Sequence, residues 1–178
     1  MKIYIVRHGQ APSNVNQVWN ITDDLTEKGI NQAEELADKI QNMKFDVMYY
    51  SDIPRAEHTA KILNSKLNLK MIFDERIRER NPGNLVGQPY EIVDREDYWN
   101  YNSVNQYGTS ENIKEFFGRV KSFLEELKEK DYDSVLIVSH KGVSKAFSAY
   151  FEGIQDGLFW NRGIKNCEIK EYELYKYF

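Results

Sequence analysis

Short apolar runs alternate with amphipathic helix patterns along most of this chain of 178 residues. Runs of strand length occupy residues 1–6, 45–50, 70–73, 134–138 and 167–174. Helical spacing of apolar residues follows Thr26 and Pro54, and recurs over Ile113–Leu127 and from about Val143 to Phe151. Because strands that alternate with helices build a sheet covered on both faces, we predict an α/β fold. The expected form is a three-layer α/β/α sandwich with a mostly parallel central sheet.

Three of the predicted strands end in polar or charged residues, where a buried strand would otherwise stay apolar. The three ends read Arg7-His8, Ser51-Asp52 followed by Arg55, and Ser139-His140. Open α/β sheets place their functional sites at the carboxyl ends of the strands. If these strands are neighbours, two histidines and two arginines share one cleft. The third histidine, His58, lies on the helix after Pro54 and is expected to be a surface or structural residue.

The overall composition limits the possible partners and location of the protein. A net charge of −4 and a pI of about 5.5 argue against general binding to nucleic acids or anionic membranes. Cys167 is the single cysteine, so no internal disulfide can form. We expect a single domain over residues 1–178, a cytoplasmic location, and a monomer or homodimer without a nucleic-acid or membrane partner.

The expected cleft suits a phosphate group better than a metal ion. Two guanidinium groups repel a metal cation, whereas they match the geometry of phosphate oxygens. The neutral nitrogen of a histidine facing a bound phosphoryl group can attack phosphorus, and the leaving oxygen then needs a proton donor. Two rival interpretations remain open: a metallohydrolase that uses His8, His140 and Asp52, and a non-catalytic sensor of phosphate ligands.

Five segments, in the family's order, resemble the histidine phosphatase superfamily, also described as phosphoglycerate mutase-like. The segments are Arg7–Asn14, Leu25–Ala33, Ser51–Ala60, Ile77–Gly87 and Val138–Gly142. Each short motif is weakly specific, but five in the correct order are strongly specific. The resemblance covers most of the chain and implies the phosphoglycerate mutase-like fold.

The resemblance also implies roles for individual residues. His8 would be the nucleophile that becomes a phosphohistidine, with its attacking nitrogen kept unprotonated by a backbone carbonyl at the other ring nitrogen. Glu79 would protonate the leaving group and later activate water. The phosphoryl oxygens would be held by Arg7, Asn14, Arg55 and His140. The resemblance implies no metal and no cofactor.

The chain departs from the family pattern at several positions. Gln10-Ala11 stands where many relatives have Glu-Thr, and Pro82 replaces an aromatic residue after the acid. Lys141 replaces a common glycine after the second histidine, and we expect its cation to contact the substrate. These changes leave the expected catalytic residues in place and bear on substrate preference.

The predicted activity is a metal-independent phosphomonoesterase acting on a small phosphorylated metabolite. Residues 87–110 are rich in aromatic side chains, and we expect some of their rings to form a short cap over the cleft. A phosphoglycerate mutase-type transfer is an alternative, although relatives of that kind usually carry longer insertions before the long helix. A phosphatase acting on phosphohistidine proteins is a further alternative.

Overall fold

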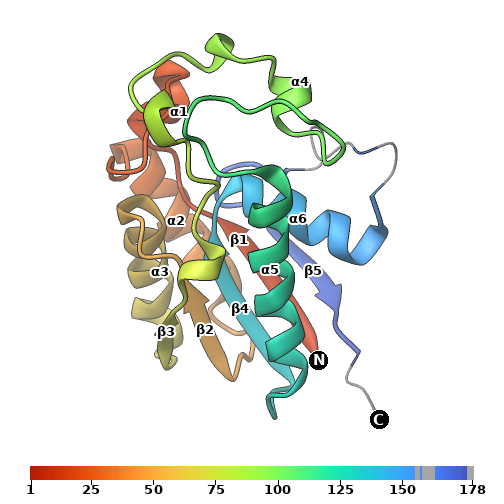
Figure 1. The fold of residues 1–178 in the computed structure, drawn as a ribbon. Coiled ribbons are helices and arrows are strands. Elements are labelled where there is room, and N and C mark those ends of the chain that lie inside the picture. The colour runs from red at the N-terminus through yellow and green to blue at the C-terminus, as the bar shows by residue number, and fades with distance from the viewer. Residues whose placement is uncertain (155–156, 158–162, 176–178) are drawn as a thin grey trace.

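A computed structural model describes residues 1–154, 157 and 163–175. Its sheet has five strands in the order β3-β2-β4-β1-β5 (Figure 1). The strands are β1 (Lys2–Arg7), β2 (Val47–Tyr50), β3 (Met71–Phe73), β4 (Ser134–Ser139) and β5 (Ile169–Glu173). The α-helices are α1 (Pro12–Asn16), α2 (Glu27–Ile40), α3 (Pro54–Leu67), α4 (Arg95–Tyr98), α5 (Ile113–Lys128) and α6 (Lys141–Glu152). Short 3₁₀ turns occupy Glu75–Ile77, Gly83–Leu85 and Tyr90–Ile92.

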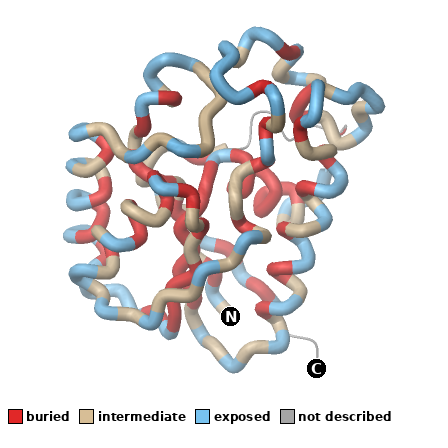
Figure 2. The backbone as a smooth tube through the Cα atoms, turned by 60° about the vertical axis from the view of Figure 1, so that its left-hand side comes forward, coloured by how far each residue is buried: buried red, intermediate tan, exposed pale blue. Residues whose placement is uncertain are grey.

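The sheet is mostly parallel and covered on both faces, which confirms the predicted α/β class. β1, β2, β3 and β4 run parallel, and β5 pairs antiparallel with β1 at one edge. Alternate residues of β4 enter two different clusters: Val135 and Ile137 pack with α5 and α6, whereas Leu136 and Val138 pack with α2 and α3. The buried positions therefore follow the strands through the middle of the molecule (Figure 2).

Capping and proline residues mark where helices α2 and α3 begin. The Thr26 hydroxyl accepts a hydrogen bond from the Gly29 amide and caps α2, and Pro54 occupies the first position of α3. From the sequence we expect a polar loop over residues 11–24, but within it Pro12–Asn16 form the short helix α1. The Asn14 side chain accepts a hydrogen bond from the Ala11 amide and so stabilises this short turn of helix.

The register of the three central strands brings their polar ends to the same level. Arg7 lies opposite Ser139, and Val138 lies between Val6 and Tyr50. The residues that follow β1, β2 and β4 therefore emerge together, as the sequence pattern predicted. The part of the chain from the 3₁₀ turn Gly83–Leu85 to helix α4 lies over this end of the sheet (Figure 1). Within the described ranges, no helix is both long and apolar enough to cross a membrane.

The loop that follows β1 packs closely against the first turn of α2 through two glycines. A Cβ atom on Gly29 would lie 2.1 Å from the carbonyl oxygen of Gln10, and one on Gly9 would lie 2.3 Å from the carbonyl oxygen of Gly29. Both contacts are with backbone atoms, which a rotamer change cannot relieve. The first turn of α2 thus holds the backbone beside His8 at close range.

Opposite effects are expected for two helical glycines replaced by alanine. Gly29→Ala gains helix propensity but forces the backbone near Gln10 to move, so we expect a loss of about 1–3 kcal/mol in the free energy of unfolding. Gly118→Ala in α5 is the matched control, because nothing lies within 4 Å of the added methyl group. It should gain about 0.5–1 kcal/mol. Denaturant unfolding measures both, and equal gains would contradict the contact.

Candidate active site

A cavity of about 260 Å³ opens beside the residues that follow β1 and β4. Six of the seven residues expected to form the site line it: Arg7, His8, Asn14, Arg55, Glu79 and Lys141. The seventh, His140, is fully buried, and its ring centroid lies 5.2 Å from that of His8. The structure therefore brings together the residues that the sequence pattern selected.

The hydrogen bonds of His8 define its tautomer. Its Nδ1 lies 2.6 Å from the Gly9 carbonyl oxygen, which can only accept, so Nδ1 carries a proton. The Arg55 guanidinium donates to Nε2 from 3.1 Å, so Nε2 presents a lone pair. This is the arrangement expected from the sequence: a backbone carbonyl holds one nitrogen and leaves the other unprotonated.

Both active-site histidines are held in the neutral form. Burial, assisted by the positive charges of Arg55 and Arg7, keeps the pKa of His8 well below its ordinary 6.5. Burial together with Arg55 lowers the pKa of His140 in the same direction. A neutral imidazole retains a nucleophilic lone pair, so both rings are suited to a site that receives an anion.

His140 is oriented by the residue that follows β2. Its Nε2 lies 2.8 Å from Ser51 Oγ, which itself accepts a hydrogen bond from the Ile53 amide. The Ser51 hydroxyl can donate to His140 Nε2, and in that tautomer the neutral ring carries its proton on Nδ1. Among the described residues, the buried Nδ1 has no hydrogen-bond partner.

Asp23 is a functional residue that the sequence interpretation missed. Its Oδ1 accepts from Arg55 Nη1 at 2.7 Å, and its Oδ2 accepts from the Ser13 amide at 2.8 Å. The two charged side chains are only 5% and 10% exposed, and a buried arginine needs such a partner. The loop before α2 contains two carboxylates, and no local pattern distinguished Asp23 from Asp24.

Arg7 and Asn14 approach the cavity from the segment around β1. Arg7 Nη1 donates to the Ile164 carbonyl at 3.2 Å, while its buried Nε has no partner among the described residues. The Asn14 side-chain oxygen accepts from the Ala11 amide and from Asn166 Nδ2, so its position is fixed. An anion in the cavity could satisfy the remaining Arg7 donor.

Glu79 contacts the N-terminus of α6 at the wall of the cavity. Its Oε2 accepts from the Gly142 amide at 3.0 Å, and its Oε1 accepts from the Arg80 amide at 2.9 Å. A Cβ atom on Gly142 would lie 2.0 Å from Glu79 Oε1, so only glycine leaves room for this contact. Gly142 therefore lets the Glu79 carboxyl group lie against the first turn of α6.

Arg119 on α5 fixes the irregular segment that carries Glu79. Its Nη1 donates to the carbonyls of Arg76 and Arg78 at 2.6 and 2.8 Å, and its Nη2 donates to the carbonyl of Glu79 at 3.0 Å. Glu111 pairs with the same guanidinium at 2.6 Å. Sequence reasoning missed both residues, because helical spacing does not reveal which loop a surface arginine contacts.

Aromatic and cationic residues complete the cavity. Tyr90 and Trp99 from the predicted cap line it, as does Trp19, while Tyr98 is buried in the core. The expectation that some cap rings reach the cleft is confirmed for Tyr90 and Trp99. Other lining residues that were not anticipated are Gln17, Asn20, Ile21, Arg80, Arg95 and Lys145.

Asp52 and His58 lie outside this cavity. Asp52 accepts two hydrogen bonds from Arg78, at 2.6 and 2.5 Å, and lines a separate groove. Among the described residues, no group of three His, Cys, Asp or Glu side chains is placed to hold a metal ion, so Asp52 does not join His8 and His140 as the metallohydrolase interpretation required. His58 is an exposed residue 2.8 Å from Asp24, as expected.

Comparison with known proteins places this chain among phosphate-transferring enzymes. Phosphoserine phosphatase 1 of Hydrogenobacter thermophilus is 31% identical over 177 residues, covering 94% of this chain and 83% of that protein. A Yersinia pestis protein named "Probable phosphoglycerate mutase GpmB" is 32% identical over 182 residues, covering 97% and 85%. The crystal structure of the alpha-ribazole phosphatase from Shigella flexneri superposes with a TM-score of 0.83 at 27% identity, covering 96% and 89%.

The family assignment rests on nearly the whole chain. The family model of the histidine phosphatase superfamily (branch 1) matches residues 3–177. This match agrees with the relatives, with the fold and with the five sequence segments, four of which contribute residues to the cavity. The chain belongs to the histidine phosphatase superfamily.

Proposed function

We propose that this phosphatase hydrolyses a small phosphate monoester through a phosphohistidine formed on His8. The tautomer of His8 carries the proposal: Nδ1 is held by the Gly9 carbonyl, and Nε2 keeps a lone pair inside a cavity lined by cations. A nucleophile of this kind needs no further base, because it is already unprotonated.

Binding of the phosphoryl group would rearrange the contacts of Arg55. In the unliganded protein, Arg55 Nε donates to His8 Nε2, which is the nitrogen that must attack. A dianionic phosphoryl group attracts the guanidinium more strongly than a neutral imidazole does. Arg55 can turn its donor to the phosphoryl oxygens while Asp23 still holds its Nη1. Arg7 Nε and His140 Nδ1 supply two further donors.

The first chemical step forms a bond between His8 Nε2 and phosphorus and breaks the bond to the leaving oxygen. Glu79 gives its proton to that oxygen, so that an alcohol leaves. In the second step Glu79 takes a proton from water, the water oxygen attacks phosphorus, and the bond to His8 breaks. Phosphate leaves, and Glu79 again holds a proton.

The size and cover of the cavity support a small substrate. A volume of about 260 Å³ lies at the small end of ligand pockets. Tyr90 and Trp99 cover it from the cap and offer ring surface to an organic leaving group. This enclosure favours a metabolite over a phosphorylated protein.

A phosphoglycerate mutase-type transfer is the second candidate, favoured by the name of the Yersinia pestis relative. The two functions differ in the acceptor of the phosphoryl group: water in one, a second substrate hydroxyl in the other. Release of inorganic phosphate at the rate of substrate consumption supports the phosphatase. Isomerisation of the substrate without phosphate release would support the mutase.

Turnover of p-nitrophenyl phosphate should depend on His8 and persist in EDTA. His8→Ala should lower kcat/KM by about three orders of magnitude or more, because no other side chain can accept the phosphoryl group. His58→Ala is the control, since this exposed histidine lies outside the cavity. Rapid quench should trap an acid-labile phosphoenzyme in the wild type. Near-normal turnover of His8→Ala contradicts the mechanism, and loss of activity in EDTA contradicts metal independence.

The protonation of His8 should differ from that of an ordinary histidine. Because its pKa is lowered, the folded protein binds this proton only at a pH well below 6.5 and keeps His8 neutral above that. Nitrogen NMR of the imidazole should show a proton on Nδ1 alone at pH 6.5. Arg55→Met should move the titration of His8 to higher pH. If His8 in the native protein titrates with a midpoint at pH 6.5 or above, its pKa is not lowered and this prediction is wrong.

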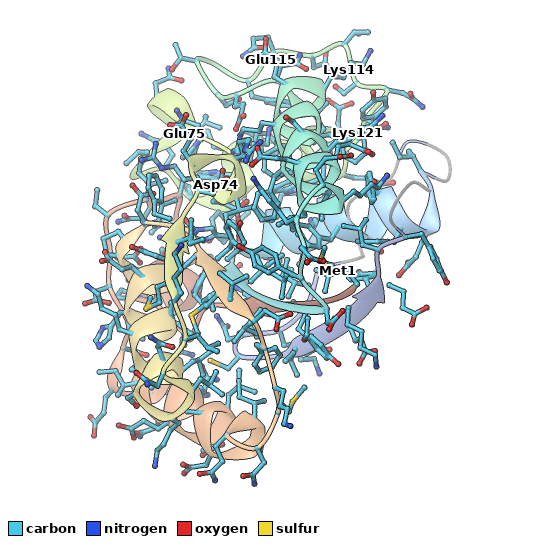
Figure 3. All side chains as sticks on the ribbon, turned by 90° about the horizontal axis from the view of Figure 1, so that it is seen from below. Met1, Asp74, Glu75, Lys114, Glu115 and Lys121 are labelled. Atoms are coloured by element: carbon cyan, nitrogen blue, oxygen red, sulfur yellow. The ribbon has the colours of Figure 1, made fainter. Side chains whose placement is uncertain are left out.

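The loss of the proton donor should depend on the leaving group. Glu79→Gln should lower kcat/KM for an alkyl phosphate by about 10²–10⁴-fold, because the alkoxide must be protonated as it leaves. The loss should be much smaller for p-nitrophenyl phosphate, whose phenolate leaves unaided. Glu115→Gln, on the exposed side of α5 (Figure 3), is the matched control. Equal losses on the two substrates argue against the acid role.

A further inference from the structure

The cavity carries more positive charge than one phosphoryl group requires. Among the described residues that line it, Glu79 is the single carboxylate, and the cations are Arg7, Arg55, Arg80, Arg95, Lys141 and Lys145. Arg80 is engaged elsewhere, since it donates to the carbonyls of Tyr98 and Glu111. Arg7 and Arg55 flank His8 and serve the phosphoryl group. Three cations remain that the proposed chemistry does not use.

Two of these cations lie one helical turn apart on α6. Lys141 and Lys145 are at positions i and i+4, so they share the face of the helix that lines the cavity. Like charges at this spacing repel, and cations at the N-terminus of a helix are unfavourable. Lys145 is moreover only 2% exposed, which is rare for a lysine. The repulsion between these two lysines therefore lowers the stability of the folded protein.

The side chains around these lysines form a defined corner of the cavity. Lys145 Nζ lies 4.2 Å from the centroid of the Trp99 ring. A Cβ atom on Gly142 would touch both Trp99 and Glu79, so the ring lies directly beside the carboxyl group. Arg95 enters from the cap, with its guanidinium 5.2 Å from the centroid of Tyr90. Each of the two rings therefore has a cation beside it, and all four residues line the cavity.

Electrostatics agree with this geometry. Burial, with the charges of Arg7 and Arg95, lowers the pKa of Lys141. Burial, with the charge of Lys141, lowers the pKa of Lys145 further. The neighbouring positive charges therefore disfavour the charged form of both lysines, and a negative group placed among them would relieve this repulsion.

We propose that Arg95, Lys141 and Lys145 bind a second anionic group of the substrate, in the corner of the cavity that Trp99 lines. This inference rests on the proposed phosphatase function and narrows its substrate class. The substrate is a phosphate monoester whose short carbon scaffold carries a carboxylate or a second phosphate. The small cavity limits the scaffold, and Tyr90 and Trp99 pack on its apolar part.

Three substrates with the same three-carbon scaffold test the subsite: propyl phosphate, 3-phosphonooxypropanoate and propane-1,3-diyl bisphosphate. Wild-type kcat/KM for at least one of the two substrates with a charged tail should exceed that for propyl phosphate by about 10- to 100-fold, the effect of one or two hydrogen bonds to a charged group. Comparison of the carboxylate with the bisphosphate identifies the second group. Equal kcat/KM values for all three substrates overturn the inference.

The double variant Lys141→Met/Lys145→Met assigns the preference to these lysines. Methionine keeps a similar length and removes the charge, and it suits the buried position of Lys145. We expect the ratio of kcat/KM between charged-tail and propyl substrates to fall below about 3-fold, whatever the change in overall turnover. Lys121→Met on the exposed side of α5 (Figure 3) is the control and should keep the wild-type ratio. If Lys145 serves only as a counter-ion of Glu79, all substrates lose equally and the ratio is unchanged.

A binding measurement separates failure of this inference from failure of the proposed function. Calorimetric titration of His8→Ala compares the Kd of propane-1,3-diyl bisphosphate with that of propyl phosphate, without turnover. Tighter binding of the bisphosphate by about 10-fold or more, lost in the triple variant that also carries Lys141→Met and Lys145→Met, supports the subsite even if no substrate is hydrolysed. Hydrolysis of all three substrates with no difference in kcat/KM or Kd overturns the subsite and leaves the phosphatase function intact.

Discussion

The parallel register between β1 and β4 is the constraint on which the site depends. Arg7 lies opposite Ser139, so the residues that follow each strand, His8 and His140, emerge side by side with ring centroids 5.2 Å apart. A slip of one residue would turn every side chain of a strand to the other face of the sheet. In β1 such a slip would exchange the buried positions of Ile3 and Ile5 with that of the half-buried Tyr4, so the core that stabilises the fold also places the two imidazoles.

Burial of charge gives the site its chemical character. Arg55 is paired with Asp23, and this buried ion pair holds a guanidinium against His8. The same burial keeps His8 neutral and therefore nucleophilic. Cations held near one another without enough carboxylates reduce stability, which is a common property of sites built to receive an anion.

The position of Glu79 depends on side chains more than on regular secondary structure. Its segment lies between β3 and α5 in the chain, and around Glu79 the carbonyls of Arg76, Arg78 and Glu79 all accept hydrogen bonds from Arg119. Glu111 and the amide of Gly142 complete its surroundings. The proposed proton donor is thus held by residues in and before α5 and in α6, which are far away in the chain.

The sequence by itself determined the alternation of strands and helices, the polar strand ends and the motifs that select His8, Arg55 and Glu79. These features are local, because hydrophobic period and capping chemistry act over a few residues. Tertiary structure alone decided that Asp23 neutralises Arg55 and that Lys145 lies buried in the cavity. Ion pairing and burial depend on contacts between segments that are distant in the sequence, and the packing of the whole chain determines those contacts.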